Sequence, residues 1–86
     1  MWINYKVEGG KFFRIYLEEE NRMVKSIKIT GDFFFYPEFG LEEVEDYLKG
    51  NSLDELGECF DKFVKEKGFE VLGFEGKDLQ AALDRR

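Results

Sequence analysis

Apolar and polar residues alternate along three runs within residues 1–30. The apolar positions are Ile3, Tyr5 and Val7 in the first run, Phe13, Ile15 and Leu17 in the second, and Ile27 and Ile29 in the third. A period of two is typical of half-buried antiparallel strands. Gly9-Gly10 predicts a two-residue hairpin turn, because glycine readily takes the positive φ that such turns need. Asn21 predicts a second turn, so we expect a three-stranded antiparallel sheet over about residues 2–30.

The apolar period becomes helical beyond residue 40. Leu41, Val44, Tyr47 and Leu48 share one face, and Gly50 is placed to end that helix. Ser52 with Glu55 predicts a capping box that opens a second helix. We expect helices at about 40–49, 52–67 and 77–84, and either a strand or a packed loop at 69–74. Strands followed by helices favour an α+β fold in which two to three helices cover one face of the sheet.

Four consecutive aromatic residues, Phe33, Phe34, Phe35 and Tyr36, follow the third predicted strand. In an extended segment they point alternately to opposite sides, so a one-sided core cannot hold all of them. One pair fills the core, and the helices cover the other pair or it meets another chain, where aromatic residues are enriched.

The residue inventory limits the chemistry available to this chain. Its 86 residues are enough for one domain, which we place at 1–86. The sequence contains no histidine and a single cysteine, Cys59, at an inward-facing helical position typical of a small buried residue. Without histidine there are no imidazole bases and no Ser–His or Cys–His pairs, and the commonest metal ligand is missing. We therefore expect no catalytic residue and no metal site.

Charge is distributed unevenly around a net value of −6. Residues 1–30 carry six basic and four acidic side chains, whereas residues 31–61 carry ten acidic side chains and only Lys49. No cluster of basic residues suits a phosphate backbone, so we expect no nucleic-acid partner. The acidic middle is either a solvated helix face or a surface that attracts a basic partner. No apolar run approaches the roughly 20 residues that span a bilayer, and no signal-peptide pattern is present, so we expect a cytoplasmic protein without a membrane partner.

Gly10-Lys11 has two interpretations. The glycine belongs to the hairpin turn, and the lysine either has no further role or presents its charge to a phosphate or carboxylate.

These segments together resemble the carboxy-terminal domain of lipoate–protein ligases. The resemblance rests on Gly10-Lys11 ahead of a strand, on Gly31-Asp32-Phe33-Phe34, on Pro37, and on the acidic helix that runs into Leu48-Lys49-Gly50. It covers about residues 8–64, and the Gly-Asp-Phe-Phe block is its most specific part. Since no motif of a catalytic domain precedes it, the chain is similar to the stand-alone small subunit of the two-polypeptide ligases.

The resemblance implies an enzyme component that is inactive alone. This family uses ATP and Mg²⁺ to activate lipoate to lipoyl-AMP, then transfers the lipoyl group to a lysine of an acceptor domain. The implied partner is the large catalytic subunit, which would hold ATP, Mg²⁺ and lipoate, while this chain binds no cofactor alone and serves the acceptor domains indirectly. The implied roles are substrate contact for Lys11 and Gly10, subunit interface for Phe33, Phe34, Phe35 and Tyr36, and structure for Gly31, Asp32 and Pro37. We expect Asp32 to orient its turn through hydrogen bonds to backbone amides.

Two other functions stay open. A non-enzymatic binding or scaffold module of small α+β type would bind a partner without altering lipoate chemistry. An independent enzyme would need a paired set of carboxylates or lysines, and the sequence shows no such pairing.

Overall fold

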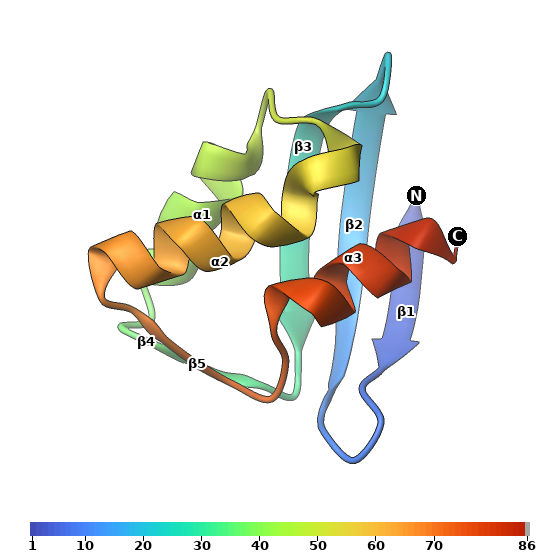
Figure 1. Ribbon diagram of the computed structural model, residues 1–86. Helices are drawn as coiled ribbons and strands as arrows, with labels where there is room; N and C mark the ends of the chain where they lie inside the picture. The colour runs from blue at the N-terminus through green and yellow to red at the C-terminus, as the bar shows by residue number, and fades with distance from the viewer. Residues whose placement is uncertain (86) are drawn as a thin grey trace.

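A three-stranded antiparallel sheet forms one layer of the computed structural model, which describes residues 1–85 (Figure 1). Its strands are β1 (Trp2–Lys6), β2 (Phe12–Glu20) and β3 (Met23–Gly31), in the order β1-β2-β3. The inward positions are the apolar ones of the period-two pattern, including Ile15, Ile27 and Ile29. The predicted sheet is confirmed.

The turn between β2 and β3 contains two residues, Asn21 and Arg22. Both have positive φ, 54° and 63°, and Glu20 pairs with Met23 across the turn. Positive φ at both central positions is the conformation that matches the twist of a hairpin. The turn predicted at Asn21 is confirmed.

The β1–β2 connection differs from the two-residue turn predicted at Gly9-Gly10. It spans residues 7–11, since β1 ends at Lys6 and β2 begins at Phe12. The Gly10 N–H donates to the Val7 carbonyl oxygen at 2.9 Å, and of the two glycines only Gly9 has positive φ, 70°. The tight turn therefore closes at Gly10, and the connection is longer than the glycine pair alone indicated.

Three helices lie on one side of the sheet: α1 (Gly40–Leu48), α2 (Leu56–Lys67) and α3 (Gly76–Asp84) (Figure 1). A short 3-10 turn, η1 (Leu53–Glu55), precedes α2. The predicted α+β fold is confirmed, and Gly68 ends α2 in the left-handed conformation, with φ 70°. No helix among residues 1–85 is long and apolar enough to cross a membrane.

The capping box predicted at Ser52 and Glu55 is wrong. The Ser52 hydroxyl accepts a hydrogen bond from the Asp54 N–H at 3.1 Å and so caps η1, while Glu55 makes no side-chain cap for α2. The extra turn of 3-10 helix separates Ser52 from the first residue of α2, and a serine can satisfy only nearby backbone N–H groups.

Aromatic rings hold the two layers together. Phe74 lies at the centre, with ring centroids 4.9 Å from Phe13 of β2, 4.9 Å from Phe33, and 5.3 Å from Phe60 of α2. Cys59 is half-buried against this core rather than fully buried, and its thiol lies 3.8 Å from the Asn51 side-chain oxygen.

The edge of β3 that pairs with no other strand of its sheet is covered by α1 and by the segment that follows α1. Glu45 of α1 is 6% exposed, and its carboxylate accepts a hydrogen bond from the Ile29 N–H at 2.7 Å. Val24 exchanges two backbone hydrogen bonds with Gly50 and Asn51. Burial raises the pKa of Glu45, against the opposing effects of the Ile29 N–H and of the Lys28 ammonium at 3.7 Å.

Candidate functional site

A two-stranded ribbon at one end of the molecule carries the aromatic run. It pairs β4 (Phe34–Tyr36) with β5 (Glu70–Leu72) in antiparallel register, below α2 in Figure 1. The alternative left open for residues 69–74 is therefore settled in part as a strand. Because side chains alternate across a strand, the ribbon has one face toward the core and one face away from it.

The outer face of the ribbon presents three apolar side chains, which we call the ribbon platform: Phe34, Tyr36 and Leu72. They are 51%, 61% and 62% exposed, respectively. Phe34 lies directly across from Leu72 in the strand register, and the rings of Phe34 and Tyr36 are parallel to within 3° at 6.4 Å. Single exposed apolar side chains are common, but neighbouring ones form a patch of the kind that marks an interaction site, so the platform is the part of the ribbon available to another molecule.

The inner face of the ribbon belongs to the core. Phe35 is 7% exposed and its ring lies 5.8 Å from that of Phe69, while Phe33 is half-buried against Phe74. Of the four aromatic residues considered for an interface, Phe35 is thus enclosed by its own chain and Phe33 is largely so. The structure leaves Phe34 and Tyr36 on the surface.

The corner before the ribbon is built around Gly31. Its φ of 150° is rare for L residues, and a Cβ there would lie 2.5 Å from the Phe12 carbonyl oxygen. Asp32 donates its backbone N–H to that same oxygen at 2.9 Å, but its exposed carboxylate makes no hydrogen bond within residues 1–85. The expectation that the Asp32 carboxylate orients the turn is corrected: the backbone does so. Pro37 follows the ribbon through a cis peptide bond with Tyr36.

Lys11 lies beside the same end of the molecule. Its backbone N–H faces the Gly73 carbonyl oxygen at 3.4 Å, and a Cβ on Gly73 would lie 2.7 Å from Lys11 Cγ and 3.0 Å from Phe33 Cβ. Two segments that the sequence separates, residues 10–11 and 31–37, therefore meet at Gly73. The Lys11 side chain is exposed, and its ammonium forms no ion pair within the part of the chain that the structure describes. Gly10 is half-buried, and its carbonyl oxygen accepts from the Lys6 ammonium at 2.8 Å.

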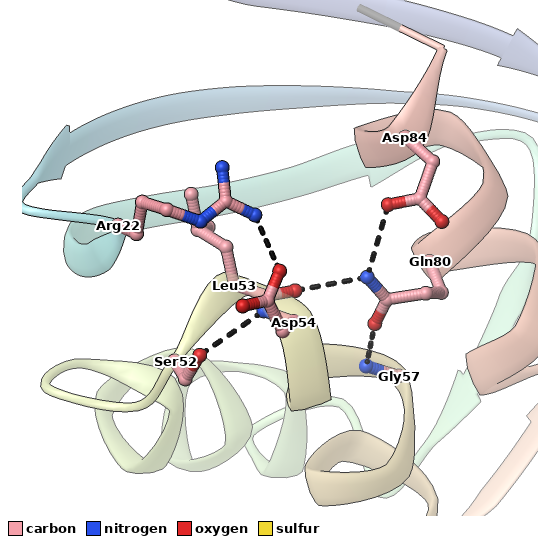
Figure 2. A network of polar contacts seen from close by, with 7 residues as sticks. All are labelled: Arg22, Ser52, Leu53, Asp54, Gly57, Gln80 and Asp84. Carbon is pink, nitrogen blue, oxygen red and sulfur yellow. Dashed lines mark hydrogen bonds and ion pairs between the residues drawn. The ribbon is translucent and has the colours of Figure 1, made fainter.

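Figure 2 shows a polar network at a different place, where α3 meets η1 and the start of α2. The Gln80 side chain accepts from the Gly57 N–H at 2.9 Å and donates to the Leu53 carbonyl oxygen at 2.9 Å and to Asp84 at 3.3 Å. Asp54 is paired with Arg22. These groups satisfy one another, so the network is structural. Across residues 1–85, no three Cys, Asp or Glu side chains are grouped to hold a metal ion.

Leu72 is a residue of the ribbon surface that sequence reasoning missed. The apolar run at 69–74 was predicted as either a strand or a packed loop, so the sequence analysis did not say which of its side chains would face outward. Its partner on β4 is 38 positions earlier in the chain, and only the register Phe34↔Leu72 shows that the two are neighbours. The period-two alternation of Phe69, Val71 and Gly73 with their neighbours is the feature of the sequence that could have predicted a strand with Leu72 on its other face.

Fold and surface together define a small α+β domain with an apolar platform on one face of its two-stranded ribbon and an exposed lysine, Lys11, at the same end of the molecule. No protein-family model matches the chain. The chain is 32% identical over 80 residues to lipoate-protein ligase A subunit 2 of Thermoplasma acidophilum, covering 93% of this chain and 83% of that relative.

A solved structure agrees with that relationship. A chain from a bi-partite lipoate protein ligase and its E2 lipoyl domain from Thermoplasma acidophilum matches with a TM-score of 0.80 and 30% identity, covering 96% of this chain and 92% of that chain. The protein described above therefore belongs to the family of the second subunit of lipoate–protein ligase A. The family resemblance drawn from the sequence is confirmed.

Proposed function

We propose that this chain is the small accessory subunit of a lipoate–protein ligase. It acts with a large catalytic subunit in the ATP-dependent activation of lipoate to lipoyl-AMP, which precedes lipoyl transfer to a lysine of acceptor proteins. The observation that carries the proposal is the 32% identity to a ligase subunit over 93% of the chain.

In this proposal the chain is one half of a cytoplasmic heterodimer and forms a single accessory domain over residues 1–86. ATP, Mg²⁺ and lipoate are bound by the large subunit, and acceptor domains meet the complex chiefly there. The physical task of this chain is to cover the site during activation. Covering excludes water from the reactive mixed anhydride and strengthens electrostatic contacts to the phosphoryl groups.

Lys11 is the side chain that we propose contacts the anionic substrate groups, with Gly10 shaping the loop that carries it. Its ammonium is exposed and unpaired among the described residues, so no internal ion pair must break before it binds a phosphate or carboxylate. Its stem packs on Gly73, which anchors the base of the side chain.

The two half-reactions separate this function from its alternatives. The large subunit, ATP, Mg²⁺ and lipoate are mixed with or without this chain, and lipoyl-AMP is measured. In parallel, an acceptor domain is given synthetic lipoyl-AMP, so that only transfer is required. We expect the chain to raise lipoyl-AMP formation strongly and to affect transfer much less. Unchanged adenylate formation, together with capture of the chain by an unrelated protein, would instead support a non-enzymatic binding module.

Lys11→Met and Lys11→Arg refine the same assay. If the ammonium contacts an anion, Lys11→Met lowers the rate of lipoyl-AMP formation at saturating chain concentration. Lys11→Arg retains part of the wild-type rate because the charge is kept. Equal rates for the wild type and Lys11→Met would remove Lys11 from the proposal and leave the subunit role intact.

A further inference from the structure

We infer that the ribbon platform, Phe34, Tyr36 and Leu72, is the surface on which the large catalytic subunit docks. This inference rests on the proposed function, because the occupant is the partner which that function requires. It goes further by assigning the contact to one face of one ribbon and by adding Leu72 of β5 to a surface that the sequence confined to the aromatic run.

The platform is preformed. Phe34 and Tyr36 are two residues apart on one strand with parallel rings, and Leu72 is the cross-strand neighbour of Phe34. On the reverse face, Phe35 packs on Phe69 and Phe33 packs on Phe74. Those inner contacts fix the backbone of the ribbon, so little freedom is lost when a partner covers the outer face.

The platform has the anatomy of an interface centre. At these exposed fractions, the two rings and Leu72 each offer about 100 Å² to a partner, so together they offer about 300 Å² of apolar surface. A stable interface buries roughly 800 Å² per partner, with an apolar aromatic centre and a polar rim. Exposed Glu70, across from Tyr36, and exposed Lys11, beside Phe33 and Gly73, are polar residues suited to that rim.

Two other surfaces are less suited to this partner. Trp2 on the outer face of the sheet is 53% exposed, but its ring is already in contact with Tyr16 at 5.1 Å and lies under the Arg14 guanidinium at 4.5 Å. The hollow between α2 and α3 is lined mainly by charged and polar side chains, and several of its acidic groups are engaged within the chain, as Asp61 is with the Gly76 N–H at 2.8 Å. In the ribbon platform, by contrast, the rings of Phe34 and Tyr36 pair with each other and with no other ring of residues 1–85.

The test measures binding and activation together for three variants. Phe34→Ser and Leu72→Ser remove apolar platform surface from β4 and β5, and Trp2→Ser is the control, since Trp2 is as exposed as Phe34 but lies on the sheet. Binding of each folded chain to the purified large subunit is measured by titration calorimetry, and lipoyl-AMP formation is measured against chain concentration. Circular dichroism verifies that every variant keeps the wild-type fold.

We expect Phe34→Ser and Leu72→Ser each to raise Kd at least about fivefold, the effect of a substantial interface side chain. Activation by these variants should recover at high chain concentration, because only docking is weakened. Trp2→Ser should keep Kd within about twofold of wild type. A normal Kd for both ribbon variants would overturn the docking inference. If the wild-type chain then still stimulates lipoyl-AMP formation, the proposed function stands, and if it does not, that function fails separately.

Discussion

Replacing Glu45 tests whether α1 protects the free edge of the sheet. The Glu45 carboxylate is enclosed by its own chain and accepts the Ile29 N–H at 2.7 Å. Glu45→Ala would leave that N–H without its acceptor beneath α1. Glu45→Gln would keep a side-chain oxygen in the same position and remove only the charge.

The expected loss of stability follows from how exposed the Ile29 N–H and the Lys28 ammonium are. An unsatisfied buried N–H costs about 1–3 kcal/mol, whereas the contact between Glu45 and the exposed Lys28 ammonium contributes little because water screens it. In a domain of this size, about 1 kcal/mol corresponds to a shift in Tm of roughly 4–8 °C. Glu45→Ala should therefore lower Tm by roughly 4–24 °C at neutral pH, whereas Glu45→Gln should leave Tm at or above the wild-type value, because Gln keeps an acceptor for the Ile29 N–H and removes the cost of the buried charge.

The contribution of Glu45 to the free energy of unfolding should decrease as pH rises. Burial raises the pKa of Glu45 above its ordinary value, so the folded chain holds this proton at pH values where the unfolded chain has lost it. The stabilisation from the protonated group is complete below the ordinary pKa and is lost as pH rises through the raised pKa. This component of the free energy of unfolding should be present in the wild type and absent in Glu45→Gln.

Urea denaturation followed by circular dichroism, repeated across acidic and neutral pH, measures both effects. Glu43→Gln on the same helix is the matched control, because Glu43 is exposed and its removal changes net charge equally. The reasoning would be refuted if Glu45→Ala were as stable as Glu43→Gln, or if Glu45→Gln kept the full pH dependence of the wild type.

Two further substitutions test the backbone corner and the network of Figure 2. Gly31→Ala should cost about 1–3 kcal/mol in urea denaturation, because its Cβ would lie 2.5 Å from the Phe12 carbonyl oxygen at a φ that L residues rarely adopt; wild-type stability would refute this. Gln80→Ala should cost about 1–3 kcal/mol, because the Gly57 N–H and the Leu53 carbonyl oxygen lose their hydrogen-bond partner; an unfolding free energy equal to that of the wild type would contradict this.

Local patterns in the sequence predicted the elements that depend on neighbouring residues. The sheet follows from the alternation around Ile15 and Ile29, and α2 ends at Lys67, as the helix expected at about 52–67 does, since each pattern acts within a few positions. The family could also be predicted, because the Gly31-Asp32-Phe33-Phe34 block that carries the resemblance consists of consecutive residues. The length of the connection at residues 7–11 was not predicted correctly, because the strand register, rather than the glycine pair, sets that length.

The features that sequence could not supply depend on distant contacts. Alternation required that two of the four aromatic residues face away from the core, but it did not say which, and the answer depends on where Phe69 and Phe74 pack. Glu45 looked like one acidic residue among many, since nothing local shows that it meets the Ile29 N–H of another element. Leu72 became part of the candidate site only through its pairing with β4.

The measurement that most directly tests the central claim is a titration of the large subunit with this chain. ATP–pyrophosphate exchange dependent on lipoate would report activation at each ratio of the two polypeptides. If the chain is the accessory half of the ligase, the exchange rate should climb with added chain and reach a plateau at one chain per large subunit. An exchange rate that stays at the level of the large subunit alone, across every ratio, would contradict the account.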